Sequence, residues 1–339
     1  MLYIFHTIIR LFISINYITF KKIQNSILVG FSYFLSRIGV LTFKGLSPTF
    51  VSVETANYCN LNCPQCPVGL REVGKLDRLR FDLVLYKKTI DELKPTLQHV
   101  ILYFQGEPLL NRQLPEFISY AHNARIYTST STNGQLLTDD MAKLLVLSGL
   151  DKLIVSVDGA TQETYESYRV GGNLERTLEG IRQTVRWKKE FKSVTPLIEV
   201  QFIVFKNNEH QLTDMKRLVT SLGADKLTFK TAQLYDYENG SQFLTSINKY
   251  ARYIKGNDGK YRLKGAQPNR CWRLWSGAVV NASGTVLPCC FDKESEFSFG
   301  NVGKKSFSEV WHTKKASDFR ANILQNRKQF EMCRNCTSK

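Results

Sequence analysis

The sequence lacks several features that would place it in common protein classes. None of its eight cysteines lies between Cys66 and Cys271, so they gather at two ends of a 339-residue chain. Disulfide frameworks are usually spread through small secreted domains, so this distribution favours metal sites in a reducing compartment. The chain also lacks a long run of lysine or arginine, although its formal net charge is +16. We therefore expect no nucleic-acid partner.

Acidic residues are absent from the first 46 positions, which hold five basic residues and two apolar stretches, 2–20 and 27–40. Polar residues interrupt the first stretch and the second is short, which argues against a membrane-spanning helix. No basic segment precedes the apolar run, which argues against a secretory signal. Two interpretations stay open. Residues 1–45 either lie on a membrane surface or form helices packed on the main domain or a partner, and packing is slightly favoured.

From residue 50 onward, apolar β-branched runs alternate with helical patterns. Six runs have the composition of buried strands, at residues 50–55, 99–104, 125–131, 152–158, 196–205 and 226–232. Between them apolar residues recur at helical spacing, and Thr138 is placed to cap one of the helices. This alternation predicts a parallel sheet with right-handed crossovers, either open or curved into a partial barrel. In both arrangements chemistry collects at the carboxyl ends of the strands.

Three cysteines follow the first predicted strand, in the stretch CNLNCPQC at residues 59–66. Cys59, Cys63 and Cys66 match three corners of a four-iron cluster, which leaves one iron open for a substrate or cofactor. This spacing directly after a first strand resembles the radical S-adenosylmethionine superfamily, whose core is a partial (β/α)6 barrel. A zinc site completed by a distant ligand is the alternative. The six-fold alternation agrees with the superfamily.

The resemblance implies a 4Fe-4S cluster whose open iron binds S-adenosylmethionine. Reductive cleavage of that cofactor would give a 5'-deoxyadenosyl radical, which abstracts hydrogen from the substrate. An electron donor of the flavodoxin or ferredoxin type is then also expected. One position departs from the family pattern, because Gln65 stands where an aromatic residue usually borders the adenine.

Other strand ends match further family positions. The stretch QGEP resembles the family's Gly-Gly-Glu-Pro, which implies that Gly106 and Glu107 hold the methionine amino group, while Gln105 replaces the first glycine. Polar residues at later strand ends would contact the ribose or the carboxylate of the cofactor: Ser131, Asn133, Ser156 and Arg169. A turn at Asn133 and a helix cap at Arg169 are the structural alternatives.

A second cysteine group lies near the carboxyl end. Its spacing resembles the opening of the SPASM iron-sulfur domain in a shortened, twitch-like form, which implies one auxiliary 4Fe-4S cluster held by Cys271, Cys289, Cys333 and Cys336. The chain would thus carry two 4Fe-4S clusters. Cys290 is left over; a small buried apolar role is favoured, with a ligand, acid–base or radical role as alternatives. We also expect a β-hairpin linking residues 279–290 to 297–302, and a helix from residue 306.

Together these patterns predict an α/β protein in four parts. A helical extension covers residues 1–48, a partial (β/α)6 TIM-like barrel 49–235, a linker 236–265 and a small α+β iron-sulfur domain 266–339. A second cluster can accept an electron from a substrate radical, which favours dehydrogenation of a sugar or other alcohol, as in twitch-bearing aminoglycoside dehydrogenases.

Two other functions stay open, namely modification of a peptide, as in sulfatase or ribosomal-peptide maturases, and non-catalytic electron transfer. The substrate is a polar small molecule, a lipid-linked molecule or a peptide, and spacing does not identify it. We expect a cytoplasmic protein, peripheral at the inner face of the membrane if residues 1–45 bind there.

Overall fold

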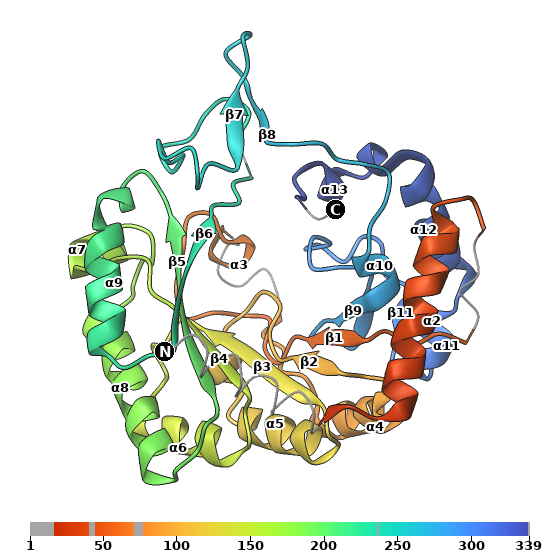
Figure 1. Cartoon of the computed structure of the whole chain (residues 1–339), viewed down its shortest axis with the longest axis horizontal. Coiled ribbons are helices and arrows are strands. Elements are labelled where there is room, and N and C mark those ends of the chain that lie inside the picture. Colours follow the sequence, from red (N-terminus) through yellow and green to blue (C-terminus); the bar gives the residue numbers. More distant parts are fainter. Residues whose placement is uncertain (1–16, 41–44, 71–76, 236, 338–339) are drawn as a thin grey trace.

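The computed structural model describes residues 17–40, 45–70, 77–235 and 237–337 (Figure 1). Parts of the predicted extension, residues 1–16 and 41–44, lie outside this range. The main sheet has nine strands in the order β11-β10-β9-β1-β2-β3-β4-β5-β6. All six predicted strands are present: β1 (Phe50–Val53), β2 (His99–Ile101), β3 (Tyr127–Thr132), β4 (Lys152–Ser156), β5 (Leu197–Val204) and β6 (Lys226–Thr231). Neighbours among these six pair in parallel, as the alternation predicts.

Helices cover the outer face of these strands (Figure 1). The longer ones are α4 (Leu83–Leu93), α5 (Leu114–Asn123), α6 (Asp139–Leu147), α8 (Leu174–Glu190) and α9 (Leu212–Ser221). Short ones are α3 (Pro67–Leu70), η1 (Pro108–Leu110), α7 (Gln162–Glu166) and η2 (Glu209–Gln211). The Thr138 hydroxyl accepts a hydrogen bond from Met141 N at 3.3 Å, so it caps α6 as predicted. The strands and helices form a partial TIM-like barrel.

The two faces of the barrel strands differ in polarity. On the helix-covered face, Val51, Val100 and Val200 belong to the buried core. The other face carries polar groups. Glu199 on β5 accepts from Lys152 Nζ at 2.8 Å and from Lys226 Nζ at 3.3 Å. Because side chains alternate along a strand, these polar groups lie on the inner face of the barrel, at the amino ends of β4 and β6.

The C-terminal part extends the same sheet. Its elements are α10 (Arg273–Ser276), β9 (Gly277–Val280), β10 (Thr285–Leu287), β11 (Gly300–Asn301), α11 (Phe307–Trp311), α12 (Lys314–Asn326), η3 (Arg327–Gln329) and α13 (Glu331–Arg334). β9 pairs in parallel with β1, which the sequence did not predict. The expected hairpin is present as the antiparallel pair β10–β11, and a capping box from Ser306 to Glu309 begins α11. The stretch predicted as a linker holds a small hairpin of β7 (Tyr253–Lys255) and β8 (Tyr261–Leu263).

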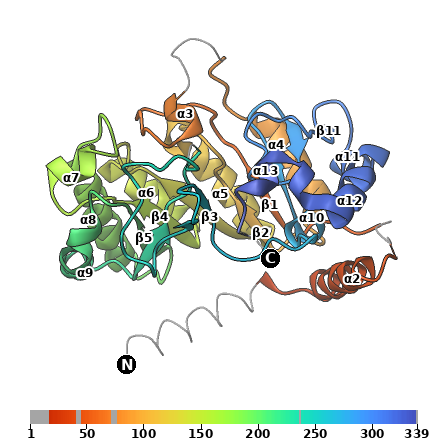
Figure 2. The same ribbon diagram turned by 90° about the horizontal axis from the view of Figure 1, so that it is seen from above.

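One long helix, α2 (Phe20–Ser36), lies within the predicted extension. It packs on the barrel near the amino ends of the first strands, where Asn25 Nδ2 donates to Ser47 O at 2.9 Å and Lys22 Nζ donates to Arg125 O. In Figure 2, α2 and α3 lie on opposite sides of the molecule. Within the described ranges, helices that combine the length and apolar character needed to span a bilayer are absent.

Candidate active site

The first cysteine group lies in the loop that leaves β1 at its carboxyl end and enters α3. This loop turns tightly, because Cys66 N donates to Cys63 O at 3.1 Å and Leu70 N donates to Cys66 O at 2.9 Å. Gly69 is required by the turn, since a Cβ there would lie 2.4 Å from Cys63 O. The structure therefore holds Cys59, Cys63 and Cys66 in one compact loop at the predicted edge of the barrel.

The surroundings of these thiols disfavour the thiolate in the absence of metal. Burial raises the pKa of the Cys59 thiol to about 12, and the nearby Glu107 carboxylate adds to the effect. Burial also raises the pKa of Cys63. The charge of Arg169, whose Nη1 lies 4.0 Å from Cys63 Sγ, opposes this shift. Thiols with raised pKa are unreactive until a metal replaces their protons, so this environment suits ligands rather than nucleophiles.

Glu107 joins the ends of β2 and β3. Its carboxylate is buried and accepts from Leu109 N at 3.1 Å, Thr132 Oγ1 at 2.7 Å and Asn133 N at 2.8 Å. Burial raises the pKa of Glu107, although these three donors oppose the shift. A carboxylate offers about four acceptor positions, so one remains for a further donor such as an ammonium group.

Gly106 permits a close approach between this strand end and the segment that enters the cysteine loop. A Cβ at position 106 would lie 2.2 Å from Ala56 O and 2.8 Å from Tyr58 N. Glu107 N donates to Tyr58 O at 2.9 Å across the same contact. The glycine of QGEP thus positions the cysteine loop against β2, whatever else it contacts.

The remaining predicted residues approach the loop from neighbouring strands. Asn133 Nδ2 donates to Asn60 Oδ1 at 2.9 Å and to Cys59 Sγ at 3.5 Å. The Arg169 guanidinium donates from Nε at 2.7 Å and from Nη2 at 2.6 Å to one carboxylate oxygen of the buried Asp158. Ser131 and Ser156 lie near the carboxyl ends of β3 and β4, on the inner face by strand alternation.

Sequence reasoning missed the role of two glutamines. Gln65 Oε1 accepts from Tyr235 N at 3.3 Å, beyond β6. Gln105 Nε2 donates to Lys293 O at 2.8 Å, in the C-terminal part. These contacts join positions 170 and 188 residues apart, and no local sequence signal predicts such pairs. Gln65 and Gln105, the two departures from the family pattern, therefore connect the first cysteine loop and the end of β2 to later segments of the chain.

The second cysteine group surrounds a small cavity. All four predicted cysteines line it: Cys271, Cys289, Cys333 and Cys336. The rest of the wall is mainly apolar, from Leu274, Phe291, Phe319, Ile323 and Met332, with Arg273 and Arg327 beside them. Cys290 is not part of this wall. The structure therefore brings the four predicted residues together and leaves the fifth outside.

The chemistry of this second donor set fits an iron-sulfur cluster. Burial raises the pKa of Cys333 to about 11 and that of Cys289 well above its usual range, while Arg327 opposes the shift at Cys333. Among described residues, no three histidine, cysteine or acidic side chains converge closely enough to hold a single metal ion. Thiolates spread around a cavity instead match a four-iron cube, because each corner takes its own ligand.

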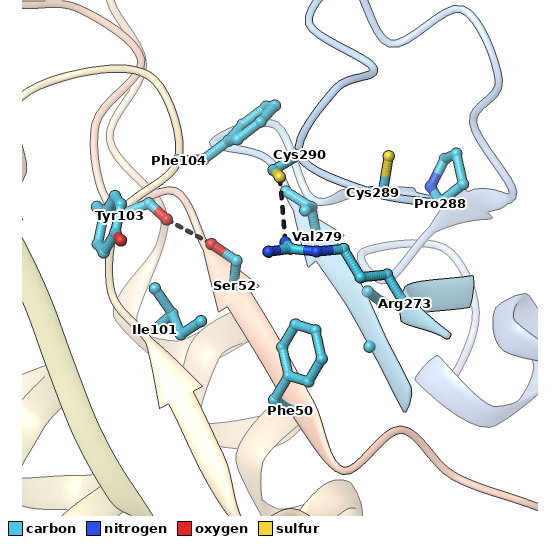
Figure 3. Close-up of a pocket in the computed structure, with 12 residues that line it drawn as sticks. Phe50, Ser52, Ile101, Tyr103, Phe104, Arg273, Val279, Pro288, Cys289 and Cys290 are labelled. Atoms are coloured by element: carbon cyan, nitrogen blue, oxygen red, sulfur yellow. Dashed lines mark hydrogen bonds between the residues drawn. The ribbon is translucent and has the colours of Figure 1, made fainter. Parts of the chain in front are cut away.

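A larger cavity of about 210 Å³ adjoins the first and shares Arg273 and Cys289 with it (Figure 3). Its walls come from β1, β2 and β9 and from Cys290, whose Sγ accepts from Arg273 Nη1 at 3.3 Å. Lys293 lies close by, with its Nζ 4.5 Å from the centre of the Phe104 ring. Burial lowers the pKa of Lys293, and the charges of Cys290 and Cys66 oppose that shift. A mainly apolar cavity with Arg273 and Cys290 in its wall thus adjoins the second cysteine group.

Comparison with known families gives two matches. Residues 53–198 match the radical SAM superfamily, and residues 271–337 match SPASM, described as an iron-sulfur cluster-binding domain. Together they include both cysteine groups.

Characterised relatives extend over most of the chain. A cofactor-modifying protein of the tungsten-containing aldehyde ferredoxin oxidoreductase of Pyrococcus furiosus is 24% identical over 85% of this chain and 87% of its own length. The PqqA peptide cyclase of Gluconobacter oxydans is 26% identical over 78% of this chain and 76% of its own. An AdoMet-dependent heme synthase of Methanosarcina barkeri is 31% identical over 52% of this chain and 49% of its own.

Solved structures share the fold. SuiB of Streptococcus suis bound to S-adenosylmethionine has a TM-score of 0.61 at 13% identity, covering 89% of this chain and 74% of its own. The anSMEcpe protein with bound AdoMet has a TM-score of 0.60 at 16% identity, covering 85% of this chain and 88% of its own. BtrN in complex with AdoMet and 2-DOIA has a TM-score of 0.52 at 20% identity, covering 88% and 95%.

Proposed function

This chain is a radical SAM enzyme with a C-terminal SPASM domain, and we propose that it abstracts hydrogen from a polar substrate held between two 4Fe-4S clusters. The observation that carries the proposal is the separation of the cysteines into a three-thiol loop and a four-thiol cavity. When bound, the clusters and S-adenosylmethionine supply the radical that abstracts hydrogen and an acceptor for the electron that the substrate gives up. The electron donor expected is of the flavodoxin or ferredoxin type.

Cys59, Cys63 and Cys66 would hold the first cluster and leave one iron for the cofactor. Glu107 has one acceptor position left and would take the methionine ammonium group, while Gly106 keeps the strand end close to the loop.

The polar residues near the loop would complete the cofactor site. Asn133 lies beside Cys59, and Arg169 lies beside Cys63 with part of its charge balanced by Asp158. Ser131 and Ser156 would contact the ribose or the carboxylate from the inner face of the barrel.

Cys271, Cys289, Cys333 and Cys336 would hold the auxiliary cluster in the apolar cavity, where the side chains exclude water. The adjoining cavity of about 210 Å³ is the proposed substrate site, because it shares Arg273 and Cys289 with the wall of the cluster cavity and reaches the carboxyl ends of β1 and β2. Arg273, at the shared wall, would orient an oxygen of the substrate.

For the reaction we favour dehydrogenation of a sugar or other alcohol, including a lipid-linked one. The inner face of the barrel carries Ser131 and Ser156 near the carboxyl ends of β3 and β4, and this polarity supports this class of substrate. Peptide modification is the second candidate, and the similarity to PqqA peptide cyclases favours it.

The direct test is to reconstitute the chain anaerobically, add dithionite and S-adenosylmethionine, and measure 5'-deoxyadenosine. We expect product from the wild-type chain and none from Cys63→Ala. A fully loaded wild-type chain that forms none would overturn the enzymatic proposal and favour an electron carrier. Incubation with deuterated alcohols, sugars and peptides then identifies the substrate class by transfer of deuterium into 5'-deoxyadenosine.

A further inference from the structure

We propose that α2 docks the enzyme on the surface of a membrane that contains anionic lipids. The helix is amphipathic in the reverse sense to a helix of a soluble domain. Its buried positions are mostly polar: Lys22, Asn25, Val29, Ser32 and Ser36. Its outward positions, continued by Ile38 just past its end, form an apolar stripe of Phe20, Ile23, Ile27, Phe31, Phe34 and Ile38, each between 45% and 79% exposed. Spacings of three and four place all six on one side of the helix.

Contacts on the buried side fix the rotation of the helix. Asn25 and Ser47 exchange two hydrogen bonds, from Asn25 Nδ2 at 2.9 Å and to Asn25 Oδ1 at 3.2 Å. Gln98 Nε2 donates to Ser26 Oγ at 2.6 Å. Turning the stripe toward the protein would break these bonds and place apolar side chains against the backbone oxygens of Ser47 and Arg125 that α2 now pairs. The stripe is therefore held outward.

An exposed apolar stripe of this length marks an interaction surface. The charge of the surrounding sequence identifies its occupant, because the first 46 residues contain five basic residues and no acidic one. Lys21 and Arg37 are exposed at the two ends of α2. Apolar residues beside lysine and arginine are the composition of helices that lie in the headgroup region of anionic bilayers.

Two other occupants fit less well. A second copy packed antiparallel on the stripe would place Lys21 of one chain against Arg37 of the other, and like charges repel. Residues 1–16 of the same chain are apolar but add a further basic residue, Arg10, instead of an acidic partner. The lipid surface is the occupant that satisfies both the apolar stripe and the excess positive charge.

Docking through α2 is compatible with catalysis. The helix contacts the barrel near the amino ends of β1–β3, whereas the cysteine loop and α3 follow the carboxyl end of β1 (Figure 2). The membrane would thus contact the side of the barrel away from that loop. This inference stands on α2 alone and does not depend on the proposed reaction.

The test is flotation of the full-length chain with vesicles of phosphatidylcholine, either alone or mixed with phosphatidylglycerol. We expect the wild type to float with the mixed vesicles and to be released by high salt. The double variant Ile27→Ser, Phe31→Ser should lower the partition coefficient at least about tenfold. The matched control Leu147→Ser, Val194→Ser changes side chains that are 57% and 58% exposed elsewhere, and it should float like the wild type.

A charge variant separates the two contributions. Lys21→Glu with Arg37→Glu should reduce flotation with mixed vesicles by about tenfold or more, since each lost charge weakens binding and each new one repels the lipid. Formation of 5'-deoxyadenosine should stay unchanged in all these variants and shows that they fold.

Three results would overturn the inference. One is a wild-type chain that does not float with mixed vesicles although it forms 5'-deoxyadenosine, which leaves the proposed function intact. Another is an equal loss of flotation in the Leu147→Ser, Val194→Ser control. The third is a wild-type dimer in light scattering that Ile27→Ser, Phe31→Ser converts to a monomer, since a second copy would then occupy the stripe.

Discussion

Replacing Gly106 with alanine should damage the first cysteine loop and spare the second cysteine group. The φ angle of Gly106 lies outside the left-handed region, so alanine meets no backbone penalty there. Space is the obstacle. The added Cβ would lie 2.2 Å from Ala56 O, 2.7 Å from Tyr58 O and 2.8 Å from Tyr58 N. All three are backbone atoms, which cannot rotate away as a flexible side chain can.

The size of the effect follows from this geometry. The two backbones must separate until the shortest contact grows from 2.2 Å to the 3.4 Å of ordinary packing. Such overpacking costs about 1–3 kcal/mol, and stretching the bond from Glu107 N to Tyr58 O adds about 1 kcal/mol. Because Tyr58 precedes Cys59, the same shift displaces the first ligand. We therefore expect a loss of about 2–4 kcal/mol of stability and a fall from about eight irons per chain to about four.

Two measurements check this prediction. Urea unfolding of the metal-free chain gives the change in stability, and iron and sulfide analysis after reconstitution gives the number of clusters. Gly30→Ala is the matched control, since a Cβ there has no atom within 4 Å. It should keep about eight irons. If Gly106→Ala unfolds like the wild type and also retains about eight irons, the close approach of β2 to the cysteine loop is not a constraint and the reasoning fails.

Further predictions concern the second cysteine group and the barrel interior. Cys271→Ala should reduce iron from about eight to about four per chain while 5'-deoxyadenosine still forms, whereas Cys290→Ala should retain about eight. Loss of four irons from Cys290→Ala would contradict the assignment of Cys289. Burial raises the pKa of the Glu199 carboxyl, but hydrogen bonds from Lys152 and Gln201 and the charge of Lys152 outweigh this effect and hold the pKa at about 2, below its usual 4.5. Its stabilising effect is thus present above about pH 4.5 and lost as pH falls toward 2. Glu199→Gln should therefore destabilise the chain by about 2 kcal/mol at pH 7 and by about 1 kcal/mol at pH 3, with solvent screening at Lys226 included. If urea unfolding gives the same difference in stability between the wild type and Glu199→Gln at pH 7 and at pH 3, this reasoning is wrong.

Much of the architecture was predictable because its helices and strands depend on patterns among residues that are close in the sequence. Alternating apolar runs and helical spacings are short-range signals: five barrel strands lie within the predicted segments, and β3 extends one residue past its segment, to Thr132. Thr138 caps α6, and the Ser306 capping box begins α11, because caps depend on neighbouring residues only. The cysteine spacings belong to the same class of signal. They indicate both iron-sulfur domains from the sequence alone.

Long-range pairing was not predictable. The joining of β9 to β1 makes the C-terminal part continuous with the barrel sheet, and the bond of Gln105 to Lys293 O spans 188 residues. The polar inner face of the barrel was not predictable either. Lys152 and Glu199, which pair there, lie among apolar neighbours in runs whose composition predicts buried strands. Such contacts depend on which faces meet, and a linear pattern does not record that.

The sequence by itself determined the superfamily, the number of thiols in each group and the order of the barrel elements, since all of these depend on residue spacing. Only the tertiary structure decided that Cys289 lines the cavity of the second cysteine group, whereas its neighbour Cys290 is absent from that wall and lies beside Arg273 in the adjoining cavity. Adjacent residues point in different directions, so spacing cannot separate them. Tertiary structure also decided which face of α2 packs on the protein. The sequence of an amphipathic helix shows a polar and an apolar face, and packing alone determines which one is buried.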